Sequence, residues 1–131
     1  MTLVVDASLV VTAVLAPDGF VELGEERLVA PWLMWSEARS ALHELLWRGE
    51  IVPEDAEAAR AGLERSPVER RDHERLGDEA WRVADELGWA KTYDAEYVAL
   101  ALLLGCRLVT VDARLRRAAD RLGCVVSPAE L

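Results

Sequence analysis

The hydrophobic residues of this chain form short continuous runs, separated by longer segments with helical spacing. Aliphatic and β-branched residues fill positions 3–5, 28–30 and 108–111, which predicts strands at 3–5, 27–30 and 108–111. The run at 108–111 is apolar enough to predict a strand buried on both faces. A weaker run at 68–70 predicts an edge strand, and 124–126 predicts a last short strand.

Elsewhere apolar residues recur every three or four positions, as they do in amphipathic helices. The predicted helices cover residues 9–15, 33–47, 53–64, 74–87, 93–104 and 113–122. Ser8 is the predicted cap of the first helix, Pro53 occupies a favourable first-turn position, and Gly105 is a residue at which a helix readily ends. Because strands and helices alternate, the sequence predicts an α/β fold with a parallel sheet of four or five strands and right-handed crossovers.

Composition describes one ordinary globular domain spanning residues 1–131, with 52% hydrophobic and 30% charged residues. No apolar run approaches the ~20 residues that cross a bilayer, and no leader is evident, so we expect a cytoplasmic protein with no membrane partner. The net charge of −9 argues against binding nucleic acid by bulk electrostatics. Cys106 and Cys124 are more readily explained as reduced structural thiols than as a disulfide.

Four acids occur in otherwise apolar surroundings. Asp6 and Asp112 directly follow predicted strands, and Glu37 and Asp94 lie near the starts of predicted helices. In a parallel sheet, residues just past the carboxyl ends of the strands line the crevice where ligands bind, and the helix N-termini point towards it. We therefore expect the four carboxylates to converge there.

Converging carboxylates repel one another unless a cation neutralises them. An all-oxygen site suits Mg²⁺ or Mn²⁺, and His43 and His73 are too far apart in the sequence to form a competing cluster. Such ions activate a water and clamp the oxygens of a phosphoryl displacement. Taken singly, the acids have simpler explanations, as helix caps or as first-turn acids favoured by the helix dipole. Their joint occurrence favours the metal site.

In their order and spacing, four segments resemble the PIN-domain family, specifically the toxin ribonucleases of VapBC toxin–antitoxin pairs. The segments are VVDAS, SEARSAL, TYDAEYVALA and LVTVDARL, and the likeness covers essentially the whole chain. The resemblance implies that the four acids are catalytic metal ligands and that Thr110 helps to position the site. Ser8 matches a small hydroxyl position, whereas Ser40 stands where many relatives have asparagine.

The resemblance also implies a PIN-like three-layer fold with strand order 3-2-1-4-5 and homodimerisation. It implies Mg²⁺- or Mn²⁺-dependent cleavage of RNA and neutralisation by a cognate VapB-type antitoxin. The alternative is a non-catalytic PIN-like module that only binds proteins, and retention of all four acids favours the enzyme.

Two groups of residues keep more than one interpretation. The arginines of the last helix could guide RNA or could form a solvated face: Arg114, Arg116, Arg117 and Arg121. The tryptophans are better explained by core or interface packing than by base stacking. Those around one helix, Trp32, Trp35 and Trp47, are the best candidates for a dimer or antitoxin surface.

Overall fold

The computed structural model describes residues 1–131 and contains one five-stranded sheet in which every pairing is parallel. The strand order β3-β2-β1-β4-β5 confirms the order implied by the resemblance. The strands are β1 (Thr2–Val5), β2 (Arg27–Ala30), β3 (Glu69–Arg70), β4 (Arg107–Val109) and β5 (Val125–Val126). The strand at the centre of the sheet, β1, pairs with β2 on one side and β4 on the other.

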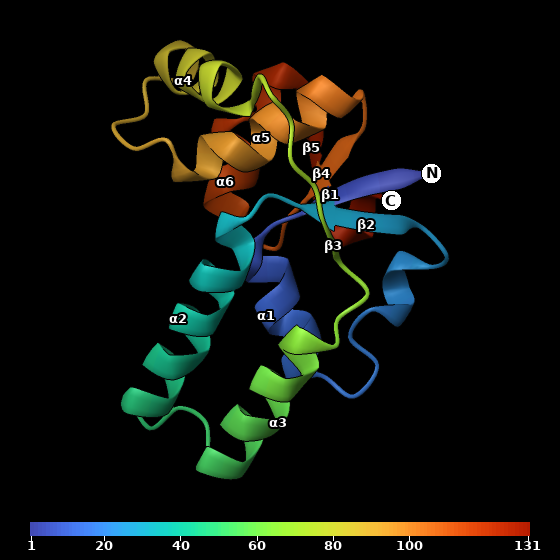
Figure 1. Cartoon of the computed structure of the whole chain (residues 1–131), viewed down its shortest axis with the longest axis vertical. Helices are drawn as coiled ribbons and strands as arrows, with labels where there is room; N and C mark the ends of the chain where they lie inside the picture. The colour runs from blue at the N-terminus through green and yellow to red at the C-terminus, as the bar shows by residue number, and fades with distance from the viewer.

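Six α-helices flank this sheet. They are α1 (Ala7–Leu15), α2 (Leu33–Trp47), α3 (Pro53–Glu64), α4 (Leu76–Leu87), α5 (Tyr93–Leu104) and α6 (Ala113–Ala118). Short 3₁₀ turns follow at Val21–Leu23, Asp120–Leu122 and Pro128–Glu130. In the view of Figure 1, α4, α5 and α6 lie beside the strands, towards the upper left, and α1, α2 and α3 lie below them.

The centre of the molecule is formed by β1 and α5. Val4 and Val5 of β1 have no exposed surface, because helices cover both faces of the sheet. Helix α5 packs against β1, β4 and α4, and it buries a continuous run of side chains from Tyr97 to Ala101. Gly105 ends α5 with a left-handed φ of 66°, which glycine adopts without strain.

Several predicted boundaries need correction. Helix α1 begins at Ala7, not residue 9, because Asp6 rather than Ser8 accepts the cap hydrogen bond from the Leu9 N–H. Strand β4 ends at Val109, so Thr110 lies just beyond it. Strand β1 begins one residue earlier than predicted, at Thr2, and the remaining elements that differ are shorter: α4 begins at Leu76, α6 ends at Ala118, β3 is Glu69–Arg70 and β5 is Val125–Val126.

The three tryptophans around α2 do not form one surface. Trp32 stacks against the Arg70 guanidinium, whose carbon lies 3.4 Å from the ring centroid, and the same carbon lies 5.4 Å from the centroid of the Trp35 ring. Trp47 is 80% exposed at the opposite end of the helix, roughly 20 Å away at 1.5 Å per residue. Cys106 and Cys124 are free thiols. None of the helices is both long and apolar enough to cross a membrane.

Candidate active site

The four predicted acids line a single pocket of about 480 Å³. Asp6 and Asp112 reach it from the carboxyl ends of β1 and β4, whereas Glu37 comes from α2 and Asp94 from the first turn of α5. The predicted convergence of these four side chains on one crevice is therefore what the fold produces. The remaining lining residues come mainly from α1 and α2.

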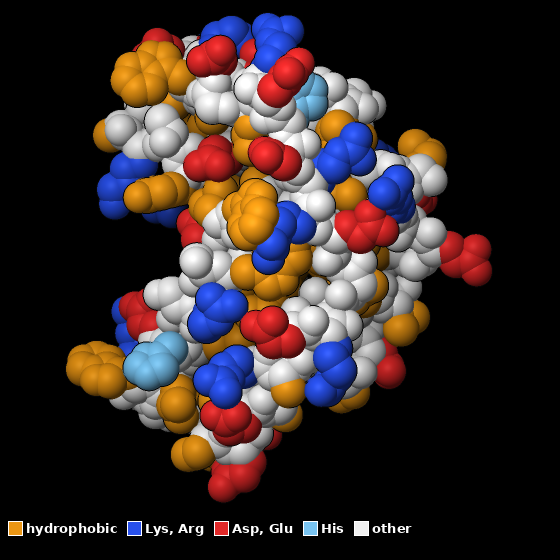
Figure 2. Space-filling model, viewed as in Figure 1, with side chains coloured by type: hydrophobic (Ala, Val, Ile, Leu, Met, Phe, Trp, Pro, Cys, Tyr) orange, Lys and Arg blue, Asp and Glu red, His pale blue; other side chains and the backbone are white.

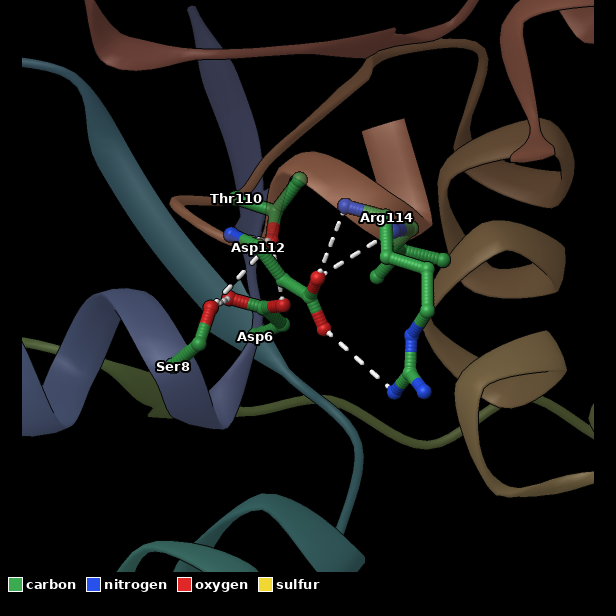
Figure 3. Close-up of polar contacts among 6 residues, drawn as sticks. Asp6, Ser8, Thr110, Asp112 and Arg114 are labelled. Atoms are coloured by element: carbon green, nitrogen blue, oxygen red, sulfur yellow. Dashed lines mark hydrogen bonds and ion pairs between the residues drawn. The ribbon is translucent and has the colours of Figure 1, made fainter. Parts of the chain in front are cut away.

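Asp6 accepts hydrogen bonds from three donors, and the bond from the Leu9 N–H makes it the cap of the helix that follows. Its Oδ1 accepts from the Leu9 N–H at 3.0 Å and from the Ser8 hydroxyl at 2.8 Å, so the carboxylate caps α1. Its Oδ2 accepts from the Thr110 hydroxyl at 2.6 Å. Only 4% of Asp6 is exposed, so its orientation is fixed by packing as well as by these bonds. The simple explanation of Asp6 as a helix cap is thus correct, and it is compatible with a place in the pocket (Figure 3).

Thr110 connects two of the acids. Its hydroxyl donates to Asp6 and accepts the Asp112 N–H at 3.0 Å. The Ser8 oxygen lies 3.2 Å from the same hydroxyl. Because Thr110 is buried at the end of β4, it couples the position of the β1 acid to the backbone that carries the β4 acid. Through this contact Thr110 would position the site, a role that stays a prediction.

Asp112 caps the last helix in the same way that Asp6 caps the first. Its Oδ1 accepts from the N–H groups of Arg114 at 2.9 Å and Leu115 at 3.3 Å. Its Oδ2 lies 4.0 Å from the guanidinium of Arg114, which extends past the pocket in Figure 3. The Arg114 side chain is 84% exposed, so this ion pair is weak.

Glu37 has a partner that the sequence interpretation missed. The hydroxyl of Tyr97 donates to Glu37 Oε1 and so connects α5 to α2 across the pocket. Tyr97 is buried and lies within the helix predicted over residues 93–104, where an aromatic side chain is readily explained by packing alone. A buried tyrosine hydroxyl needs a partner. That requirement indicates that Tyr97 has a polar partner, but nothing in the local sequence identifies the partner as Glu37.

The electrostatics of the pocket disfavour the charged carboxylates in the metal-free protein. Burial raises the pKa of Asp6, and Asp94 adds to the rise, although the hydrogen bonds from Thr110, Leu9 and Ser8 oppose it. Burial likewise raises the pKa of Glu37, opposed by the Tyr97 hydroxyl and reinforced by Asp94 and Asp6. For Asp94, partial burial and the charge of Asp112 raise the pKa. Each of these carboxyl groups would gain from a nearby cation.

Asp6, Glu37 and Asp94 have no lysine or arginine ion pair, whereas many acids elsewhere on the surface do. The donor set, carboxylate oxygens supplemented by hydroxyls, fits a hard divalent ion. However, no three acidic, histidine or cysteine side chains lie close enough together to ligate one ion. Binding an ion therefore requires these side chains to approach one another more closely than they do here.

The arginines of the last helix divide into different environments. Arg116 is held in ion pairs with Asp120 and Glu130, and Arg121 donates to the backbone oxygen of Glu86. Arg117 is exposed and has no ion pair, whereas Arg114 lies at the edge of the acidic pocket. Of the remaining candidates, Ser40 and His43 line a different pocket, between α2 and α3.

Comparison with known proteins agrees with this architecture. The model of a family described as the PIN domain matches residues 3–121. A Mycobacterium tuberculosis protein named Ribonuclease VapC9 is 38% identical over 115 residues, which cover 86% of this chain and 87% of that protein. The Mycobacterium bovis protein named VapC ribonuclease Mb0985 gives the same values. The crystal structure of PAE2754 from Pyrobaculum aerophilum aligns with a TM-score of 0.75 and 27% identity, over 99% of this chain and 91% of that one.

Proposed function

Because the chain belongs to the PIN-domain family and is closely related to VapC ribonucleases, we propose that it is a divalent-metal-dependent endoribonuclease. In this proposal it is the toxin of a type II toxin–antitoxin pair. The observation that carries the proposal is the single pocket lined by Asp6, Glu37, Asp94 and Asp112. Three of these acids lack a cationic side-chain partner and have raised pKa values. Such a pocket is suited to a bound cation.

We assign the four acids as the ligands of Mg²⁺ or Mn²⁺, in a site with one or two ions. When bound, such an ion polarises the phosphodiester and lowers the pKa of an attacking water. The protein's own contribution is to orient the ligands. Thr110, Ser8 and the Leu9 N–H orient Asp6, and Tyr97 orients Glu37. No side chain needs to be assigned as a separate general base.

The partners follow from the same assignment. RNA is the substrate, and a cognate VapB-type antitoxin with a basic segment would neutralise the acidic pocket. The net charge of −9 favours such a basic partner. Homodimerisation is also part of the proposal.

Cleavage of total cellular RNA by the purified, antitoxin-free protein tests the activity. We expect discrete fragments with Mg²⁺ or Mn²⁺, no fragments with EDTA, and no fragments from Asp94→Asn under any condition. Glu57→Gln, which removes an exposed acid on α3 away from the four acids, is the matched control and should cleave like wild type. Absence of cleavage by a folded wild-type protein that binds metal would instead support a non-catalytic binding module.

A further inference from the structure

A second pocket, of about 560 Å³, adjoins the acidic one and shares Glu37 and Asp94 with it. Its volume falls in the range of sites for small organic ligands, which is roughly 300–1,000 Å³. We refer to it as the flanking pocket. Resting on the proposed ribonuclease function, we propose that the flanking pocket binds the nucleotide of single-stranded RNA that lies next to the scissile phosphate, with Lys91 and Arg114 on its phosphate and Tyr93 against its base.

The charge of the flanking pocket differs from that of the acidic pocket. Lys91, the only lysine in the chain, and Arg114 both line it. Lys91 has no ion pair, and the only ionic contact of Arg114 is the 4.0 Å approach to Asp112. In a protein of net charge −9, two largely unpaired cations beside four carboxylates form a local binding site for an anion. Phosphate is the anion that the neighbouring acidic site would bring to them.

Aromatic side chains supply a surface for a base. Tyr93 lies in the first turn of α5, is 57% exposed and lines the flanking pocket. Trp89 lines it as well but is half-buried and packs against the core, so it forms a wall rather than a free stacking face. A base stacked on a tyrosine ring is bound without regard to its identity. The combination predicts binding of single strands with little sequence preference at this position.

The surface around the pocket supports this assignment. Figure 2 shows a hollow on the left edge of the molecule between its upper and lower parts, with Lys or Arg side chains on the upper lip. In the same view of Figure 1, that lip is formed by the start of α5 and by α6. An acidic peptide would be repelled by the four carboxylates, and a basic segment would be attracted to the acidic pocket rather than to Lys91 and Arg114. An RNA strand suits both pockets once the carboxylates hold metal.

The chain offers matched controls. Arg117 lies on the same helix as Arg114, is exposed, and lines neither pocket, so Arg117→Ala makes the same change in charge. Tyr93→Phe keeps the ring that Tyr93→Ala removes. The backbone N–H of Arg114 that caps onto Asp112 persists in Arg114→Ala, so this substitution leaves the helix cap in place.

The test is the affinity of each variant for a labelled single-stranded RNA of about 12 nucleotides, a length within the usual range of single-strand sites. Fluorescence anisotropy is measured with Mg²⁺ present at several salt concentrations, and every variant, like the wild-type reference, carries Asp6→Asn in addition so that the RNA is bound but not cleaved. Affinity falls as salt rises, and we expect Lys91→Ala and Arg114→Ala each to make the plot of log affinity against log salt less steep. The steepness should decrease by about 0.7, the value for one lost phosphate contact to a single strand. We expect Tyr93→Ala to weaken binding by about 5-fold or more. Arg117→Ala should match wild type, and Tyr93→Phe, which keeps the stacking ring, should lose much less affinity than Tyr93→Ala.

Steady-state cleavage by the same variants with Asp6 retained, and with Mn²⁺ present, gives a second measurement. Lys91→Ala, Arg114→Ala and Tyr93→Ala should raise KM and retain most of kcat, because they remove binding rather than chemistry. If wild type cleaves RNA but these variants match Arg117→Ala in salt slope and KM, the flanking pocket is not a nucleotide site and the ribonuclease assignment stands. If wild type neither binds nor cleaves RNA, both proposals fail. If Lys91→Ala, Arg114→Ala and Tyr93→Ala weakened binding to a protein partner but left RNA affinity unchanged, the assignment to RNA would also be overturned.

Discussion

At the scale of single residues, the site is built from side chains that each meet a structural need as well as a chemical one. Asp6 caps α1 through one carboxylate oxygen and accepts from Thr110 through the other. Asp112 caps α6 while its second oxygen faces the pocket. Capping fixes Asp6 and Asp112 close to their own backbone, and binding an ion then requires the four acids to approach one another more closely. Orientation of this kind is what a binding site needs from its scaffold.

The substitution Asp6→Asn separates the structural role of Asp6 as a helix cap from its chemical role as a charged carboxylate. Asparagine also caps helices well, so the variant should fold, whereas loss of the negative charge should abolish metal-dependent cleavage. In EDTA at neutral pH its unfolding free energy should equal or exceed that of wild type, because burial raises the pKa of Asp6 in the folded state. Asp6→Ala is the contrast: it loses the cap and should lose about 1 kcal/mol.

The sign of the pH dependence follows from the raised pKa. The contribution of Asp6 to stability is fully present below its unfolded pKa and is lost as pH rises through its higher folded pKa. The stability of Asp6→Asn relative to wild type should therefore be greater at about pH 8 than at about pH 5. Thermal or urea unfolding at both values measures it. A relative stability that fell with increasing pH would mean that the hydrogen bonds to Asp6 outweigh its burial.

At the scale of elements, patterns that depend on local chemistry were predictable. The bounds Leu33–Trp47 and Pro53–Glu64 match prediction, since apolar periodicity and a proline at the start of α3 define them. The end of β4 did not match prediction, because threonine favours strands and the sequence therefore predicted that Thr110 belongs to β4. In the structure the Thr110 hydroxyl instead donates to Asp6 and accepts the N–H of Asp112. Its role came from family resemblance. The contact of Tyr97 with Glu37 spans 60 positions and leaves no local pattern.

That contact between α5 and α2 makes a testable prediction. Tyr97→Phe removes the donor to Glu37 and should lower the unfolding free energy by about 1.5–3 kcal/mol in EDTA at neutral pH, because a hydrogen bond to a charged group is lost. The Tyr97 hydroxyl opposes the rise in the pKa of Glu37, so its loss should raise that pKa further. The destabilisation should be smaller at acid pH, where Glu37 is protonated with or without Tyr97.

A double-mutant cycle isolates the pair. In a Glu37→Gln background the carboxylate is absent, and Tyr97→Phe should then cost less than it does in wild type. Urea unfolding of the four proteins gives the coupling free energy. An equal cost in both backgrounds would assign the effect of Tyr97 to core packing, since the side chain is only 1% exposed.

At the scale of the whole molecule, the distribution of charge matters more than its sum. Net charge alone argues against nucleic-acid binding, yet the structure places Lys91 and Arg114 beside the acidic pocket and holds Arg116 in ion pairs elsewhere. Many surface acids are paired with arginine, whereas Asp6, Glu37 and Asp94 are not. The repulsion among these acids therefore destabilises the folded protein at one pocket, and a divalent ion bound there can relieve it.

Metal binding should consequently stabilise the whole fold, independently of any cleavage. An ion that binds only the folded state adds about 2.7 kcal/mol to the unfolding free energy at 100 times its Kd. Differential scanning calorimetry with added Mn²⁺ should show this gain for wild type. The gain should increase with pH, because Asp6, Glu37 and Asp94 have raised pKa values and must lose protons before they ligate the ion.

Variants decide whether the gain comes from the acidic pocket or from general screening of a protein of charge −9. Asp94→Asn should lose most of the Mn²⁺ stabilisation, whereas Glu57→Gln, which removes the same charge from the exposed surface of α3, should retain it. Equal stabilisation of the two variants would indicate screening alone. Loss in Asp94→Asn only would locate the ion where the two pockets meet, because Asp94 lines both. The ion would then lie beside Lys91 and Arg114, where it could act together with them on one RNA strand.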